Sequence, residues 1–107
     1  MNTACLFCDI SRKDDALIWQ NLDFVAFKDI NPKAKTHVLI VPKVHIDSLD
    51  DLDALKEGGL LIEATQQVAS HLGVAGAYRI QINVGADGGQ EIDHLHIHLL
   101  SDRKALE

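Results

Sequence analysis

Three histidines alternate with aliphatic residues in one short segment, His94-Leu95-His96-Ile97-His98-Leu99-Leu100. On a β-strand successive side chains point to opposite faces, so the three imidazoles are expected on one face at a spacing of ~6.6 Å. The aliphatic residues then face the core. Imidazole either ligates a metal or acts as a nucleophile and proton carrier near neutral pH. The segment therefore predicts a histidine ladder with one of these two chemistries.

A glycine-rich segment, Gly85-Ala86-Asp87-Gly88-Gly89-Gln90, precedes the ladder. Because glycine has no Cβ, the backbone N–H groups of such a loop can approach an anion closely. A glycine loop by itself is equally typical of a plain turn. Next to a histidine ladder, it predicts a cradle that presents a phosphate to a nucleophile.

The two cysteines of the chain lie together in Cys5-Leu6-Phe7-Cys8. Two cysteines make no disulfide framework, which favours a reducing, cytoplasmic location. A thioredoxin-like redox motif should follow a strand, and only four residues precede Cys5. Two readings remain: cysteines that form no site, or a structural zinc that takes two further ligands from histidines on strands.

The composition is that of a single soluble domain spanning residues 1–107, with 47% hydrophobic and 24% charged residues. A net charge of -6 argues against a nucleic-acid polymer as partner, whereas a few local donors can still hold one small phosphorylated ligand. No apolar run approaches the ~20 residues of a membrane span, and no signal peptide is expected before Cys5. The terminal Leu106-Glu107 is compatible with a remnant of a cloning vector.

The helices and strands that position these residues are predicted from the periodicity of apolar residues and from the positions of glycine and proline. A helical turn is expected over residues 5–12, and strands over 17–19, 24–28, 37–41, 78–84 and 92–100. A long amphipathic helix, capped by Asp47 and Ser48 and ended near Gly73 and Gly76, lies between the third and fourth strands. Gly58-Gly59 weakens it by about 1 kcal/mol per glycine, so its first turns could be separate. The prediction is an α+β fold with a five-stranded antiparallel sheet, one long helix and a short N-terminal helix.

The segment 88–98 resembles the signature of the histidine triad family, in which His-φ-His-φ-His-φ-φ (φ, apolar) follows a Gly-Gln element. Further matches to that family cover residues 24–30, 36–45 and 78–83, nearly the length of the chain. The resemblance implies a hydrolase that acts on nucleotides through a transient nucleotidyl-histidine.

The resemblance also implies a role for each matching residue. His96 would attack the α-phosphorus, with its other ring nitrogen held by a backbone carbonyl, and His98 would donate to the phosphate oxygens. His37 would relay a proton behind the triad. The remaining expected contacts to a nucleotide, with a purine favoured, are the backbone of Gly89, the side chains of Asn83 and Gln90, Asp29 on the ribose, and a base pocket of Leu6, Phe27 and Ile30.

Two features depart from the nucleoside phosphoramidase branch of the family. Glu91 stands where that branch often has serine, and it could protonate a leaving group only if its pKa were raised. The chain also stops soon after Leu100, without the longer tail of that branch. The leaving group is therefore left open.

The family pattern also supplies the two missing metal ligands. A structural zinc on Cys5 and Cys8 would be completed by His45, after the Pro-Lys element, and by His94, the first histidine of the ladder. No organic cofactor is expected.

Several functions are consistent with these observations. The favoured one is hydrolysis or nucleotidyl transfer at the α-phosphorus of a nucleoside phosphoramidate or adenylate. Asn83 favours this branch over the dinucleoside polyphosphate hydrolases, which tend to have glutamine there. Two different functions stay open, a metal-dependent hydrolase with His94, His96 and His98 as ligands of a catalytic ion, and a non-catalytic nucleotide-binding protein. The resemblance implies a homodimer.

Overall fold

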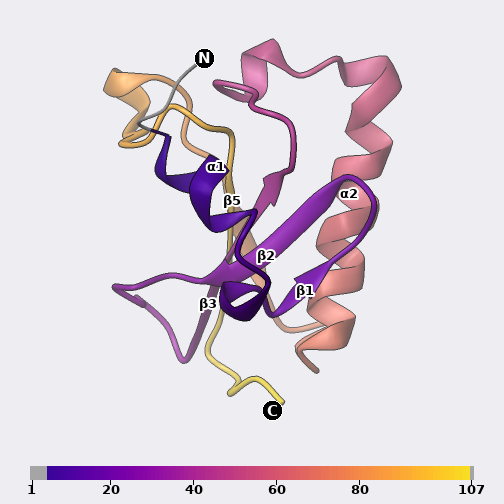
Figure 1. The fold of residues 1–107 in the computed structure, drawn as a ribbon. Helices are drawn as coiled ribbons and strands as arrows, with labels where there is room; N and C mark the ends of the chain where they lie inside the picture. Colours follow the sequence, from indigo (N-terminus) through magenta and orange to yellow (C-terminus); the bar gives the residue numbers. More distant parts are fainter. Residues whose placement is uncertain (1–4, 107) are drawn as a thin grey trace.

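A computed structural model describes residues 5–106, so residues 1–4 of the expected N-terminal segment and Glu107 lie outside the described part. Among the described helices, none has the length and apolar character needed to cross a bilayer. The elements in chain order are α1 (Leu6–Ile10), β1 (Trp19–Gln20), β2 (Phe24–Lys28), β3 (Thr36–Pro42), α2 (Ala54–His71), β4 (Arg79–Gln81) and β5 (Ile97–Ser101) (Figure 1). Short 3-10 turns occupy Asp14–Ala16, Leu49–Asp51 and Ala86–Gly88.

The five strands form one antiparallel sheet in the order β1-β2-β3-β5-β4, which confirms the predicted fold class. The first three strands are consecutive neighbours. The chain then passes through α2 to β4 at the far edge, and β5 returns between β3 and β4. The strand that carries His98 is therefore paired on both sides, which fixes its position.

The two helices cover opposite faces of the sheet (Figure 1). Leu95, Ile97 and Leu99 face α2 and pack in the larger core, as the alternating pattern predicts. On the other face, Phe7 of α1 packs with Phe27 of β2 and other apolar side chains of β2 and β3. All seven residues of β3 are buried because both of its faces are covered.

The long helix begins later than the sequence predicts. Its N-cap is Asp53, whose side chain accepts the Lys56 N–H at 3.2 Å, while Glu57 accepts the Asp53 N–H at 3.1 Å. These two reciprocal hydrogen bonds satisfy two free backbone donors at the helix start, so the predicted caps Asp47 and Ser48 are wrong and lie before a separate 3-10 turn. The helix runs unbroken through Gly58-Gly59 because its following turns are anchored in the core by buried side chains, Leu61, Ala64, Thr65, Val68 and Ala69.

Three predicted strands differ from the structure by more than one residue at an end, whereas β3 is longer than predicted by one residue at each end. Leu17 N–H closes the preceding 3-10 turn on Asp14, so β1 starts only at Trp19. β4 stops at Gln81, short of the predicted Val84, as the chain turns toward the glycine loop. The last strand begins at Ile97 rather than Ile92, because Leu95 N–H donates to Ile46 at 2.6 Å instead of to a strand partner.

The core predicts a clear stability difference between two leucines. Leu99→Ala removes a side chain with 0% exposure and should lower the free energy of unfolding by about 3 kcal/mol. Leu55→Ala, at the fully exposed start of α2, is the matched control and should change it by less than about 0.5 kcal/mol. Urea unfolding followed by circular dichroism measures both. Equal effects of the two substitutions would contradict the described packing.

Candidate active site

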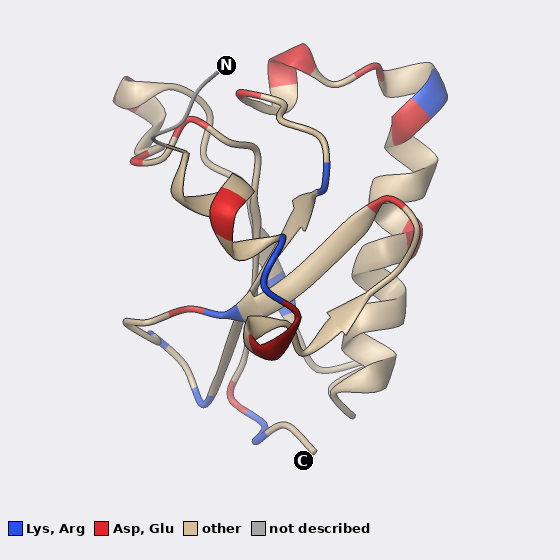
Figure 2. Cartoon of the chain, in the orientation of Figure 1, with Lys and Arg blue, Asp and Glu red and all other residues tan. Residues whose placement is uncertain are grey.

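A cavity of ≈ 330 Å³ lies between α1, the loop from β2 to β3, and the glycine loop. It is lined by ten of the predicted site residues: Leu6, Phe27, Asp29, Ile30, His37, Asn83, Gly89, Glu91, His96 and His98. Lys28 and Lys33 also line it, and they belong to the segment from β2 to β3, whose lysines are blue in Figure 2. The cavity thus offers local cations to an anionic ligand although the chain as a whole is acidic. Gln90 and His94 lie outside the lining.

The orientation of His96 follows from one hydrogen bond. Its Nδ1 lies 2.8 Å from the backbone carbonyl oxygen of His94. A carbonyl can only accept, so Nδ1 carries the proton, and in the neutral ring Nε2 keeps its lone pair. The residue is buried, with 7% exposure, yet it lines the cavity. This is the arrangement of a nucleophilic imidazole.

His98 and His37 form a chain behind His96. The backbone N–H of Lys33 donates to Nδ1 of His37 at 3.1 Å, so the proton of the neutral His37 ring is on Nε2. That Nε2 lies 2.9 Å from Nδ1 of His98 and 3.4 Å from the Asp29 carboxylate. When His37 donates to His98, the proton of His98 is on its other nitrogen. The two histidines can therefore present an N–H donor beside His96, whose ring centroid lies 4.9 Å from that of His98.

Burial keeps both members of this chain neutral. It lowers the pKa of His98 below the ordinary value of 6.5, and the neighbouring His96 and His37 act in the same direction. It also lowers the pKa of His37, where the Asp29 carboxylate opposes the effect only in part. Neutral rings can pass a proton along the chain, so the geometry suits acid–base chemistry near pH 7.

Phe7 is a site residue that the sequence interpretation missed. Its ring centroid lies 5.0 Å from that of His96 and 5.5 Å from that of Phe27, with edge-to-face geometry in both pairs. It lines the cavity together with Leu6. The signal was its place between the two cysteines, because the turn that directs Cys5 and Cys8 away from the cavity directs the two intervening residues toward it.

The glycine loop is held by Asn83. The side-chain N–H of Asn83 donates to the carbonyl of Gly88 at 2.8 Å, which leaves a second N–H on the same amide. Gly89 has φ 87°, and a Cβ at that position would lie 3.2 Å from the Asn83 amide nitrogen. The backbone N–H of Gly89 itself donates to Ala86 at 3.1 Å. Glycine is therefore required at 89 by both conformation and space.

Asp29, Ile30 and Glu91 also line the cavity. One Asp29 oxygen accepts the Asn31 N–H at 2.8 Å, and the other faces His37. Ile30 and Glu91 are exposed, with their side chains available to a ligand.

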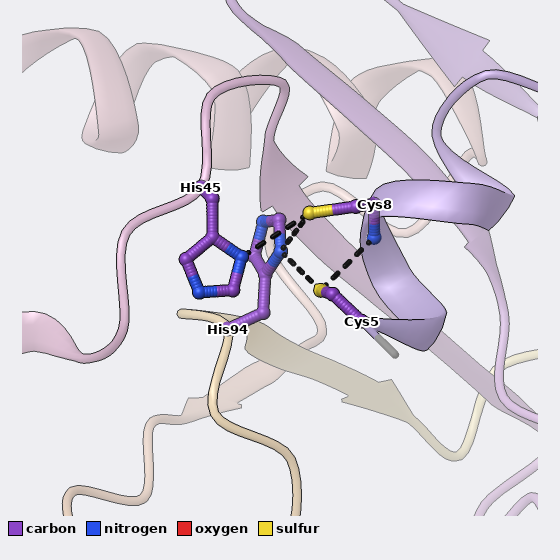
Figure 3. A group of neighbouring side chains, drawn as sticks. All are labelled: Cys5, Cys8, His45 and His94. Atoms are coloured by element: carbon purple, nitrogen blue, oxygen red, sulfur yellow. Dashed lines mark hydrogen bonds between the residues drawn. The ribbon is translucent and has the colours of Figure 1, made fainter. Parts of the chain in front are cut away.

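A second cluster joins Cys5, Cys8, His45 and His94, whose potential ligand atoms lie within 4.8 Å of one another. The cysteines come from the start of α1, His45 from the loop after β3, and His94 from the segment before β5 (Figure 3). Nδ1 of His94 lies 3.2 Å from Sγ of Cys5, and Nδ1 of His45 lies 3.2 Å from Sγ of Cys8. All four predicted ligands are thus brought together.

The imidazoles of this cluster have the tautomer that a metal requires. Nε2 of His94 donates to the carbonyl of Pro42 at 3.0 Å, and Nε2 of His45 faces the Asp47 carboxylate at 2.7 Å. Both Nδ1 lone pairs therefore point at the thiols, and such outer partners are typical of metal-binding histidines. The N···S distances of 3.2–3.4 Å are close to the edge of about 3.5 Å in a tetrahedral zinc site. The donor set fits a metal.

A metal-dependent hydrolase is less well matched by the geometry. His94 directs its free nitrogen to the cysteines, and His96 uses Nδ1 on a carbonyl, so the three ladder histidines do not converge on one point. Within residues 5–106, a further group of possible ligands is Asp29, His37 and His98. In that group, Nε2 of His37 and Nδ1 of His98 already form a hydrogen bond with each other.

Comparison with known proteins identifies the family. The HIT domain profile matches residues 11–105. The chain is 37% identical to Protein HitA of Neisseria gonorrhoeae over 100 residues, which cover 90% of this chain and 94% of the relative. It is 36% identical to the purine nucleoside phosphoramidase of Escherichia coli (strain K12) over 103 residues, covering 92% and 87% of the two chains.

Solved structures agree with this assignment. A HIT family hydrolase from Legionella pneumophila Philadelphia 1 superposes with a TM-score of 0.82 at 35% identity, covering 94% of each chain. A zinc-bound histidine triad family protein from Mycobacterium smegmatis has a TM-score of 0.74 at 28% identity, covering 94% of this chain and 76% of that one. The chain belongs to the HIT family, the histidine triad family.

The lowered pKa values predict acid sensitivity. The unfolded chain takes up protons on histidine at about pH 6.5, whereas folded His37 and His98 resist protonation until lower pH. The unfolded state therefore binds more protons, and the free energy of unfolding should fall as the pH drops below 6.5, by up to about 1.4 kcal/mol per pH unit for each group. Thermal melts between about pH 7 and about pH 5 measure the slope.

His98→Asn should make this slope shallower because it removes one of the two groups. A melting temperature that rises on acidification, or an unchanged slope in His98→Asn, would contradict the described burial.

Proposed function

We propose that the chain is a nucleotide hydrolase that cleaves a bond at the α-phosphorus through a transient adduct on Nε2 of His96. The observation that carries this proposal is the hydrogen bond from Nδ1 of His96 to the His94 carbonyl, which leaves Nε2 free at the cavity. The proposed substrates are nucleoside phosphoramidates or adenylates, with a purine favoured. The similarity to a purine nucleoside phosphoramidase supports this class, and transfer of the nucleotidyl group to another acceptor uses the same intermediate.

The proposed first step forms a phosphorus–nitrogen bond and breaks the bond to the leaving group, which departs with the electron pair of that bond and a proton supplied through the His98–His37 chain. Nε2 of His96 supplies the electron pair. The N–H of His98 stabilises the charge that develops on the phosphate oxygens, aided by the free N–H of Asn83, and Gly89, which has no Cβ, lets the loop approach the phosphate closely. Glu91 is the cavity residue that we expect nearest to the leaving group.

The second step is hydrolysis of the adduct. Water attacks the phosphorus, its proton leaves, and the electron pair of the phosphorus–nitrogen bond returns to His96. His98 and His37 are the adjacent groups that can carry the proton. Asp29 would hold the ribose, while Leu6, Phe27 and Ile30 would contact the base.

We further propose that Cys5, Cys8, His45 and His94 hold a structural zinc. Four protein ligands leave no open position, so the ion would stabilise the fold rather than act on substrate. The zinc-bound relative supports this assignment.

The proposed assembly is a cytoplasmic homodimer. β4 is an edge strand with all three residues exposed, so its unpaired backbone can accept a second sheet. The free state of both cysteines is consistent with a reducing compartment.

The function predicts that His96→Ala abolishes turnover of adenosine phosphoramidate, by roughly 10⁴-fold or more in kcat. Adenosine monophosphate binding should change little because Asp29 and the base pocket remain. Steady-state kinetics and calorimetry measure the two quantities, and His71→Ala, at the exposed end of α2, is the matched control. Turnover near that of the unsubstituted protein in His96→Ala would refute the mechanism.

The metal assignment predicts one zinc per chain in protein purified without chelator. Cys8→Ser should lose the ion and lower the melting temperature by on the order of 10 °C, because binding free energy contributes to folding. Elemental analysis and thermal melts measure both, and His71→Ala should keep the ion. Unchanged zinc content and melting temperature in Cys8→Ser would show that the site does not exist.

A further inference from the structure

The side chain of Gln90 is fully occupied by the protein itself. Its Nε2 donates to the carbonyl of Asp47 at 2.6 Å and to the carbonyl of Ile92 at 3.0 Å. Its Oε1 accepts the backbone N–H of Gly85 at 2.9 Å. Both N–H donors of the amide are used, and Gln90 is not among the residues that line the cavity. A direct bond from Gln90 to a substrate phosphate would break one of these contacts.

On one side, Gln90 reaches the cysteine–histidine cluster. Its acceptor Asp47 also holds Nε2 of His45 through the carboxylate, and Nδ1 of His45 points at Cys8. A metal that fixes His45 therefore restricts the segment whose carbonyl receives the Gln90 amide. The path from His45 to Gln90 therefore consists of two hydrogen bonds, one to the Asp47 carboxylate and one to the Asp47 carbonyl.

On the other side, Gln90 holds the glycine loop. Gly85, whose N–H it accepts, begins the 3-10 turn Ala86–Gly88 with φ 72°. The Gln90 backbone N–H returns to the Gly85 carbonyl at 2.9 Å, so side chain and backbone close the loop together. Gly89 of the loop and the adjacent Ile92 line the cavity. The position of the loop at the cavity thus depends on the Gln90 side chain.

We propose that Gln90 is a positioning residue that couples metal binding at the Cys5, Cys8, His45 and His94 cluster to nucleotide binding at the glycine loop. Each ligand then raises the affinity for the other, by the same factor in both directions. The inference rests on the proposed function in two respects, that the glycine loop faces the phosphate of a nucleotide and that the four-residue cluster binds a metal.

Two substitutions isolate the contacts. Gln90→Ala removes all three, whereas Gln90→Glu keeps an acceptor for Gly85 but removes both donors to the carbonyls of Asp47 and Ile92. Gln67→Ala, on the exposed face of α2, is the matched control. Zinc affinity is measured by competition with a chromophoric chelator, with and without saturating adenosine monophosphate.

In the unsubstituted protein and in Gln67→Ala, adenosine monophosphate should raise zinc affinity about tenfold. In Gln90→Ala and Gln90→Glu the increase should be less than about twofold. Nucleotide titrations of the zinc-loaded proteins should show affinity about tenfold weaker for the two Gln90 variants than for the control. Retention of the tenfold increase in Gln90→Ala would overturn the proposal.

A cobalt-loaded sample gives a readout that does not require a folded metal-free chain. Adenosine monophosphate should shift the d–d absorption bands of the cobalt-loaded protein and of Gln67→Ala, but not those of Gln90→Ala. An equal shift in Gln90→Ala, or none in an unsubstituted protein that binds the nucleotide, would refute the coupling. If the protein binds the nucleotide and shows the coupling but has no turnover, only the proposed hydrolysis is refuted. If the protein does not bind the nucleotide, both the proposed function and the proposed coupling are refuted.

Discussion

The hydrogen bond between Nδ1 of His96 and the carbonyl oxygen of His94 determines which nitrogen of His96 can react. The bond is short, 2.8 Å, and the residue that accepts it is fully buried. His94 is itself fixed at both ring nitrogens, by the Pro42 carbonyl and by the cysteines. The geometry of the proposed nucleophile therefore depends on the end of β3 and on the N-terminal turn, although neither contributes a reacting atom.

The cluster and the cavity share the same short segment of chain. Within Cys5-Leu6-Phe7-Cys8, the outer residues contact the histidines of the cluster and the inner residues line the cavity. Phe7 packs its ring against both His94 and His96, at 6.1 and 5.0 Å between centroids. A metal held by the cysteines would thus also hold one wall of the cavity, and the proposed role of Gln90 would connect it to the wall formed by the glycine loop.

Alternation along the ladder was sufficient to predict which residues enter the core, and Leu95, Ile97 and Leu99 are found there. It was not sufficient for the start of the last strand, because the donor of Leu95 finds its partner in the distant residue Ile46. For the same reason the sequence could not predict the hydrogen bonds that link Lys33, His37 and His98, because the first donor is a backbone N–H in a loop. Residue types indicated the chemistry, whereas partners far apart in sequence decide the tautomers.

The central claim is that His96 forms a covalent bond to phosphorus, and trapping that bond tests it most directly. Rapid acid-free quenching with an adenosine phosphoramidate labelled at the α-phosphate, followed by peptide mass spectrometry, should find the label on His96. The adduct should be labile in acid and stable in base, as expected for phosphorus on an imidazole nitrogen. Label on Glu91 or on a cysteine, or steady turnover with no protein-bound label under conditions that slow hydrolysis, would contradict the account.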